Sequence, residues 1–253
     1  MTFTLGVVEL GGQSAWRRAH ADRRLAGRTL LEWVVRQTTD AQRLDRVVVT
    51  LPEAADARRA AEGLPSDVPI VWTEETDCLA TCAAALDQFQ PDAIVRVGAD
   101  TPFLDPALID RLVTTAEEHR QCDYISYCSR SGSPTVLASL GLCAEWCRAD
   151  ALRVAEYEAT DAVDRGDITR FIRAHPERFQ LRMIPLPVAM DREDVRLAVA
   201  AGEDWDCAHL IHEALGAEEL DWSRIAGLLE QQPALRERMA ELNRLEHGTT
   251  DRA

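Results

Sequence analysis

The first half of the chain alternates between short apolar runs and longer segments in which apolar residues recur every three or four positions. Apolar, β-branched runs of this length predict strands, and the periodic segments predict helices. The predicted strands read TLGVVEL, RVVVTLP, VPIVWT, DAIVRVG and CDYISYC, and the helices between them read RTLLEWVVRQ, EAADARRAAEG, DCLATCAAALDQF and DPALIDRLVTTAEEH. This alternation indicates βαβ units and a mostly parallel, doubly wound sheet. Ligands of such sheets bind beyond the carboxyl ends of the strands, which directs attention to the loops at 10–28 and 98–105.

The rhythm changes after residue 128. Loop and short-strand signals are followed by the predicted helices ADALRVAEYEA, DITRFIRAH and EDWDCAHLIHEAL, and by the predicted strands RFQLRMIPLP and VRLAVA. Two amphipathic helices, split by Pro233, form the tail. We therefore predict one α/β domain over residues 1–217, with an inserted arm at about 129–180, and a helical C-terminal extension over 218–253.

Composition narrows the functional classes. The formal net charge is −15, which argues against a general nucleic-acid binder because neutralising a phosphate backbone needs a basic face. No lysine occurs, so every fixed positive charge is an arginine. No apolar run approaches the roughly 20 residues that span a bilayer. The opening residues MTFTLGVVEL lack the features of a secretion signal. We expect a soluble, cytoplasmic protein without nucleic-acid or membrane partners.

The cysteines and two of the histidines give no clear metal site. The seven cysteines lack zinc-ribbon or CxxC spacing, and Cys78 and Cys82 share the apolar stripe of a predicted helix, so we interpret them as buried packing thiols. His209 and His212 lie three residues apart in a helix, a spacing that can hold a metal. Both histidines lie away from the predicted apolar side of that helix, so we expect them to face solvent. The residues of that apolar side are Cys207, Leu210, Ile211, Ala214 and Leu215.

The loop after the first predicted strand is rich in glycine and arginine. Gly11 and Gly12 permit close backbone approach to a phosphate, and five arginines follow within twelve residues: Arg17, Arg18, Arg23, Arg24 and Arg28. In an acidic protein this concentration favours a phosphate or other anion site. The alternative is a solvated basic loop.

The stretch RVGADTPFLDP carries the sharper signal. Asp100 follows a strand that ends near Val97, where a carboxylate can hold Mg²⁺ beside a triphosphate. It can equally be a turn-forming or capping residue. Arg96 can orient the Asp100 carboxylate through a bidentate pair, or simply neutralise it. Asp105 and Pro106 are typical of a helix start.

Five stretches of the chain resemble the spore-coat polysaccharide type of cytidylyltransferase, a family related to the acidic-sugar cytidylyltransferases. They read LAGRTLLEWVVRQ, AIVRVGADTPFLDPALID, GLCAEWCRADALRVA, DAVDRGDITRFIRAHPERF and DVRLAVAAGEDWDCAHLI, and the tail QQPALRERMAELNR is also similar. The resemblance implies a nucleotide-diphospho-sugar transferase fold. It also implies transfer of a nucleotidyl group, CMP from CTP, to a sugar or sugar acid with release of pyrophosphate, in a homodimer formed through the arm.

The resemblance implies roles for particular residues. The triphosphate is held by the glycine and arginine loop, Mg²⁺ by Asp100, and the sugar near the arm. The implied catalytic residues are Arg17, His20 and Arg96, and the implied binding residues are Gly11, Gly12, Arg18 and Glu145.

Three departures from the family pattern fall on functional positions. Leu10, Gly11 and Gly12 stand where relatives carry an arginine, His20 stands near the family's lysine, and Ala200 replaces a second metal-binding aspartate. Glu203 and Asp204 follow, but a shift of three residues changes the geometry. We therefore expect weak, nucleotide-dependent Mg²⁺ binding. The second hypothesis is a binding or assembly protein that keeps the fold and has lost the chemistry.

Overall fold

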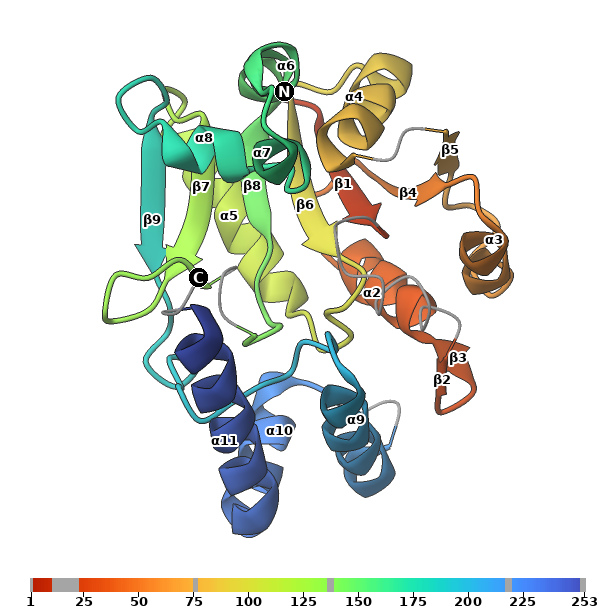
Figure 1. The fold of residues 1–253 in the computed structure, drawn as a ribbon, viewed down its shortest axis with the longest axis vertical. Helices are drawn as coiled ribbons and strands as arrows, with labels where there is room; N and C mark the ends of the chain where they lie inside the picture. The colour runs from red at the N-terminus through yellow and green to blue at the C-terminus, as the bar shows by residue number, and fades with distance from the viewer. Residues whose placement is uncertain (1, 11–22, 75–76, 136–138, 217–219, 251–253) are drawn as a thin grey trace.

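A seven-stranded sheet forms the centre of the protein (Figure 1), as seen in a computed structural model. The structure describes residues 2–10, 23–74, 77–135, 139–216 and 220–250, with side chains in the last helix only as far as residue 246. The strands are β1 (Thr4–Glu9), β4 (Arg46–Pro52), β5 (Ile70–Thr73), β6 (Ala93–Gly98), β7 (Tyr124–Cys128), β8 (Glu145–Arg148) and β9 (Leu181–Pro185). A separate small hairpin joins β2 (Arg24–Leu25) to β3 (Arg28–Thr29).

The sheet is mostly parallel, which confirms the prediction from the sequence. Its order is β5-β4-β1-β6-β8-β7-β9, and β8 is the strand that runs antiparallel to both of its neighbours. The chain moves from β1 to β4 and β5 on one side and then returns to place β6 on the other side of β1. This reversal creates a topological switch point between β1 and β6, where ligands bind in open α/β sheets.

Helices cover both faces of the sheet because successive strand residues point in opposite directions. Val8 faces a core that includes residues of α2 (Leu30–Thr39), α3 (Ala55–Ala61) and α5 (Pro106–Glu118). Val7 faces the other core, which includes residues of α4 (Cys78–Phe89), α6 (Ala149–Glu158) and α8 (Arg170–Ala174). The short helix α7 (Ala162–Arg165) lies beside α8 on the second face (Figure 1). Both faces are thus buried, as the continuous apolar strands indicate.

Local sequence signals set several helix starts. Asp105 caps α5 through a hydrogen bond from the amide of Ala107 at 2.9 Å, and Pro106 occupies the first turn, as predicted. Cys78 and Cys82 are buried in α4, which confirms their packing role. Among the helices of the described residues, none is long and apolar enough to cross a membrane.

The C-terminal helices gather at one end of the sheet. They are α9 (Gly202–Leu215), α10 (Trp222–Gln231) and α11 (Pro233–Thr250), and Figure 1 shows them at the end toward which the arrows of β6, β7 and β9 point. Their apolar residues join the core that contains α2 and α5. The boundaries of the arm and of the C-terminal extension stay predictions.

Residues 193–200, which we name the strap, do not form the strand predicted from VRLAVA. The amides of Leu197 and Ala198 donate to the carbonyl of Ser139 at 3.0 and 3.1 Å, and the amide of Val199 donates to the carbonyl of Asp100 at 2.7 Å. Because these hydrogen bonds go to loops, the strap does not join a sheet edge.

The solvent-facing position predicted for His212 is also wrong. His212 is 6% exposed and lies between the rings of Trp33 and Phe103, with ring centroids 4.8 and 5.7 Å away. The buried side of α9 is turned by about one residue from the predicted seam, so Leu210 is exposed in its place. The helix packs against α10 and also against α2, and a single amphipathic seam does not describe both contacts.

Candidate active site

Asp100 lies at the carboxyl edge of the sheet, beside the switch point. In the register of β1 and β6, Glu9 pairs with Gly98, and the amide of Ala99 donates to the carbonyl of Glu9 at 3.0 Å. Asp100 therefore lies two residues beyond the end of β6, at the edge where the neighbouring strand β1 also ends. This placement confirms the position predicted for Asp100, while its role as a metal ligand stays a prediction.

A tight turn holds the Asp100 loop. The amide and hydroxyl of Thr101 both donate to the carbonyl of Gly98, at 3.3 and 2.8 Å. The Asp100 carboxylate folds back over Gly98, and a Cβ atom placed on that glycine comes within 2.5 Å of Asp100 Oδ1. The absence of a side chain at residue 98 therefore makes room for the carboxylate.

The strap brings Ala200 next to the Asp100 loop, because the Val199 amide is bonded to the Asp100 carbonyl. Asp204 cannot replace the missing carboxylate there. One of its oxygens accepts from the amides of Ala200 and Ala201 at 2.9 and 2.8 Å, and both of its oxygens pair with Arg196. Asp204 is therefore committed to fixing the end of the strap and the start of α9.

The chemistry of the donor set fits one mode of metal binding. Within the described ranges, no group of three or more His, Cys, Asp or Glu side chains is arranged to hold a metal. Mg²⁺, however, is commonly bound by one or two carboxylates together with substrate phosphates and waters. Asp100 can supply that single carboxylate, so the residues suit a metal delivered with a nucleotide better than a metal bound alone.

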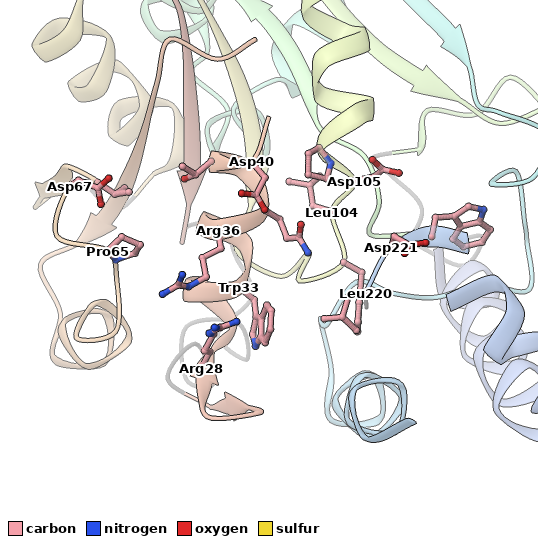
Figure 2. A pocket seen from close by; sticks show the side chains of 16 residues that line it. Arg28, Trp33, Arg36, Asp40, Pro65, Asp67, Leu104, Asp105, Leu220 and Asp221 are labelled. Atoms are coloured by element: carbon pink, nitrogen blue, oxygen red, sulfur yellow. The ribbon is translucent and has the colours of Figure 1, made fainter. Parts of the chain in front are cut away.

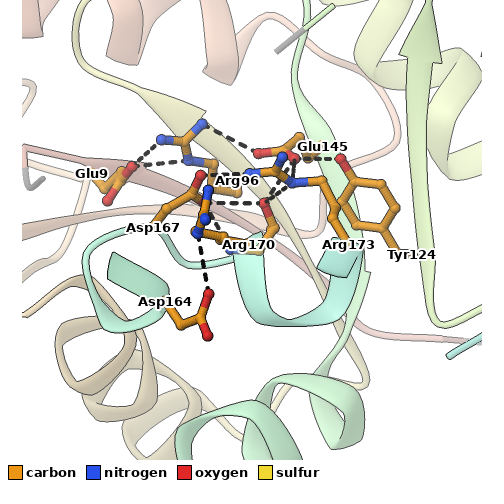
Figure 3. Close-up of polar contacts among 9 residues, drawn as sticks. Glu9, Arg96, Tyr124, Glu145, Asp164, Asp167, Arg170 and Arg173 are labelled. Carbon is orange, nitrogen blue, oxygen red and sulfur yellow. Dashed lines mark hydrogen bonds and ion pairs between the residues drawn. The ribbon is translucent and has the colours of Figure 1, made fainter. Parts of the chain in front are cut away.

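Arg96 pairs with two glutamates, while its predicted role beside Asp100, orienting or neutralising that carboxylate, stays a prediction. Its Nε lies 2.9 Å from Glu9 Oε1 and its Nη1 lies 3.2 Å from Glu145 Oε2 (Figure 3). Burial by itself lowers the pKa of Arg96, but the charges of Glu9 and Glu145 outweigh burial and raise that pKa well above its ordinary value. Arg96 therefore stays charged and joins β1, β6 and β8 across the sheet.

Glu145 lies at the centre of this group of side chains, with 1% exposure. Its Oε1 accepts hydrogen bonds from the hydroxyls of Tyr124 and Thr169. Burial, followed by the nearby charge of Glu145, raises the pKa of Tyr124 well above its usual value. The predicted ligand-binding role of Glu145 stays a prediction.

Arg173 and Asp167 complete what we name the Arg96 network (Glu9, Arg96, Tyr124, Glu145, Asp167, Thr169 and Arg173). Arg173 pairs with Asp167 and lies 3.7 Å from Glu145. Burial raises the pKa of Asp167, but the charges of Arg96 and Arg173 lower this pKa by a larger amount. The net shift of the pKa is therefore downward, and Asp167 is ionised at neutral pH. Glu9, Asp167 and Arg173 are not among the site residues predicted from the sequence. Only Glu9 carried a signal, as a charged residue ending an apolar strand.

The other predicted site residues lie outside the described residues. These are Gly11, Gly12, Arg17, Arg18 and His20. Their roles stay predictions.

A separate groove of about 640 Å³ lies on the α2 and α5 side of the molecule. Figure 2 shows Arg28, Trp33, Arg36 and Leu104 among the residues that line it. The guanidinium of Arg28 lies 4.7 Å from the centre of the Trp33 ring, a cation–π contact. The groove shares the segment 103–106 with the Asp100 loop. Arg28, one of the five arginines of the predicted anion-binding loop, lines the groove, whereas Arg96, Asp100 and Glu145 do not.

Residues 11–178 match the MobA-like NTP transferase domain family, and the chain belongs to this family. The chain is 23% identical over 189 residues to the spore coat polysaccharide biosynthesis protein SpsF of Bacillus subtilis, covering 74% of this chain and 75% of that protein. It is 33% identical over 111 residues to a 3-deoxy-manno-octulosonate cytidylyltransferase of Alcanivorax borkumensis, covering 41% of each.

Solved structures support the same fold. A cytidylyltransferase from Leptospira borgpetersenii superposes with a TM-score of 0.77 at 16% identity, covering 93% of this chain and 96% of that one. Rv0371c from Mycobacterium tuberculosis, solved in complex with manganese, superposes with a TM-score of 0.58 at 21% identity, covering 83% and 99%. The nucleotidyltransferase fold expected from the sequence resemblance is therefore confirmed.

Proposed function

We propose that the protein transfers a nucleotidyl group, CMP from CTP, to a sugar or sugar acid and releases pyrophosphate. The observation that carries this proposal is the position of Asp100 at the carboxyl edge of the β1–β6 switch point, in a chain of the NTP transferase family. The relatives named as cytidylyltransferases support cytosine as the base. The name of SpsF supports a role in surface polysaccharide synthesis.

Positioning and charge neutralisation are the main requirements of this chemistry, since an oxygen of the acceptor attacks the α-phosphorus in line. A divalent metal, Mg²⁺ in our proposal, neutralises the triphosphate when bound. Asp100 supplies its protein carboxylate, while Gly11, Gly12, Arg17, Arg18 and His20 hold the phosphates. The structure that contains manganese supports a divalent ion in this fold.

The test is a pyrophosphate-release screen of four nucleoside triphosphates against a panel of sugars, with Mg²⁺ and with Mn²⁺. We expect release with CTP, and loss of that release in Asp100→Asn. Asp105→Asn is the matched control, because it removes a carboxylate from the same loop while asparagine still caps α5. Equal release by wild type and Asp100→Asn contradicts the proposed role of Asp100.

The second candidate function is a degenerate homologue that binds a nucleotide or assembles with an active partner. Ala200 beside the Asp100 loop favours this function, because the second carboxylate of the family pattern is missing. Measurable CTP binding without pyrophosphate release under any condition of the screen selects it over the enzyme.

We further propose that the chain forms a homodimer through the arm at 129–180. Large apolar side chains are exposed there, with Tyr157 at 87% and Val163 at 52%. Tyr157→Glu places a charge in this surface and is expected to yield a monomer in light scattering at micromolar concentration. A monomeric wild-type protein under the same conditions contradicts the proposal.

A further inference from the structure

The strap is buried although it belongs to no sheet. The side chains of Val195, Leu197 and Val199 are at most 2% exposed. Buried backbone N–H and C=O groups need hydrogen-bond partners, and a strand obtains them from its neighbours in a sheet. In the strap these partners must come from other parts of the chain, so the residues that supply them determine where the strap lies.

Asn243, in the second half of α11, supplies partners for the first half of the strap. Its Nδ2 donates to the carbonyl of Glu193 at 2.9 Å and to the carbonyl of Val195 at 3.0 Å. Its Oδ1 accepts from Nη1 of Arg196 at 3.4 Å. One side-chain amide therefore uses both its nitrogen and its oxygen to hold the strap against α11.

Glu246 lies three residues further along α11, on the same face of the helix as Asn243. Its Oε2 accepts from the hydroxyl of Ser139 at 2.8 Å and pairs with Arg196. The carbonyl of Ser139 in turn accepts the amides of two strap residues, as described above. The second half of α11 therefore holds the strap and also the segment against which the strap lies.

Both of these held segments are bonded to the Asp100 loop. The amide of Val199, near the end of the strap, donates to the carbonyl of Asp100 at 2.7 Å. The amide of Asp105, at the other end of the loop, donates to the carbonyl of Leu142 at 3.1 Å. Figure 1 shows α11 at the same end of the sheet as the connection from β6 to α5, which contains this loop. The loop is therefore attached at two points to backbone that α11 holds.

We infer that Asn243 is a positioning residue of the proposed active site, which acts through the strap to fix the Asp100 loop where its carboxylate meets a metal–nucleotide complex. This inference rests on the proposed function, since it concerns how the same site is held. Without the amide of Asn243, the carbonyl of the buried Val195 loses this partner, so the strap shifts or opens. The Asp100 loop then loses its fixed neighbour and opens more often.

The test uses Asn243→Leu, which keeps a branched side chain of similar size and removes the amide. Amide hydrogen exchange of the ligand-free protein, measured by mass spectrometry, reports local opening segment by segment. We expect exchange in residues 99–105 to accelerate at least tenfold, while β4 keeps the exchange of wild type. Calorimetry with CTP, with and without Mg²⁺, measures the effect on the site. We expect the gain in CTP affinity that Mg²⁺ produces to fall at least fivefold, because a metal that Asp100 holds together with phosphates depends on the position of this carboxylate.

Two variants serve as controls. Arg238→Gln removes an exposed ion pair between α11 and Asp206 of α9, and it leaves the contacts of Asn243 in place. Ile172→Val shortens a buried side chain in the core on the other face of the sheet, so it lowers the overall stability without touching the strap. Both variants should keep the exchange of residues 99–105 and the Mg²⁺ effect of wild type.

Three results overturn the inference: unchanged exchange of residues 99–105 in Asn243→Leu, the same acceleration in Ile172→Val, or faster exchange with an unchanged Mg²⁺ effect. If Asn243→Leu does not fold, Ser139→Ala takes its place, because the bond from Ser139 to Glu246 is exposed, and the same three results then decide. A wild-type protein whose CTP affinity does not respond to Mg²⁺ rejects the proposed metal site itself. That result is separate from the exchange data, so the two failures are distinguishable.

Discussion

The amide of Val199 donates a hydrogen bond to the carbonyl of Asp100 at 2.7 Å, which fixes the strap beside the proposed metal-binding loop. The next residue, Ala200, occupies the position at which related sequences are expected to carry a second aspartate. Asp204 accepts a hydrogen bond from the amide of Ala200 and so holds the end of the strap in place. In the proposed metal site, the strap therefore holds residue 200 beside the Asp100 loop, and Asp100 is the carboxylate that this site would use.

Restoring the second carboxylate should strengthen metal–nucleotide binding. Ala200→Asp is expected to tighten the binding of Mg²⁺–CTP by about 1–3 kcal/mol, because it adds a charge-assisted oxygen ligand to a metal held by Asp100 and phosphates. Asp100→Asn should abolish the effect of Mg²⁺ on CTP affinity. Isothermal titration calorimetry with and without Mg²⁺ measures both changes.

Ala201→Asp is the control for added charge in the same segment. Residue 201 is the N-cap of α9, so an aspartate there suits the helix start and should leave the Mg²⁺ effect unchanged. If neither Ala200→Asp nor Asp100→Asn alters CTP affinity in Mg²⁺, the pocket is not a nucleotidyltransferase site.

Close packing of the strap against Gly141 should make this glycine irreplaceable. Gly141 has φ +70°, and a Cβ atom there comes within 2.4 Å of the Ala198 nitrogen. Gly132 has φ +86° with nothing within 4 Å. Gly132→Ala should therefore cost only the left-handed backbone penalty of about 1–2 kcal/mol, while Gly141→Ala adds a backbone clash.

Urea unfolding of the two glycine variants measures the difference. We expect Gly141→Ala to lose at least about 1 kcal/mol more of the free energy of unfolding than Gly132→Ala, because a clash with backbone atoms is relieved only by moving the strap. Equal losses show that the strap has no fixed position against residue 141.

Part of this architecture follows from the sequence alone. The alternation of strand and helix signals predicts a sheet covered on both faces, and Val7 and Val8 do bury their side chains on opposite faces. Asp105 and Pro106 mark the start of α5. These signals are local. The same local logic places Asp100 after a buried strand, at the edge where ligands bind.

Other features depend on contacts between distant residues. The sequence VRLAVA has the composition of a strand, but its amides bond to Ser139 and Asp100, which no local pattern reveals. The partners of Arg96 lie 87 and 49 residues away in Glu9 and Glu145. Helical periodicity could not place His212, because two packing contacts bury more of α9 than one stripe.

The two ion pairs of Arg196, a residue of the strap, should contribute very differently to the free energy of unfolding. Arg196 is buried and forms two hydrogen bonds with the equally buried Asp204, whereas its second ion-pair partner, Glu246, is half exposed. Arg196→Met leaves the Asp204 charge buried without its ion-pair partner and should cost about 3–5 kcal/mol. Glu246→Gln should cost at most about 1 kcal/mol.

Thermal or urea unfolding distinguishes these two variants directly. The double variant Arg196→Met with Asp204→Asn removes both buried charges and should recover part of the loss, because no charge then stays buried alone. A loss in Arg196→Met no larger than that in Glu246→Gln shows that the buried pair does not fix the strap.

His212 should make stability depend on pH between neutral and acidic conditions. Burial, together with the nearby charges of His209 and Arg28, lowers the pKa of His212 from 6.5 to about 4. Neither ring nitrogen has a hydrogen-bond partner among the described residues. In the unfolded chain the imidazole binds a proton below about pH 6.5, whereas in the folded protein it stays neutral down to about pH 4.

The sign of the effect follows from these two pKa values. Between pH 6.5 and 4 the unfolded state binds more protons than the folded state, so the contribution of His212 to stability is lost as the pH falls through this window. Over the whole window the loss approaches about 3 kcal/mol.

His212→Leu keeps an apolar side chain between Trp33 and Phe103 and removes the titrating group. The difference in the free energy of unfolding between wild type and this variant, measured in urea at pH 7.0, 5.5 and 4.5, should therefore shift by about 2–3 kcal/mol in favour of the variant. His209→Leu removes an exposed imidazole near Glu213 and leaves His212 buried, so it should keep most of the pH dependence of wild type, slightly reduced because the charge of His209 also lowers the His212 pKa. Parallel pH dependences of wild type and His212→Leu show that His212 is not held neutral in the folded protein.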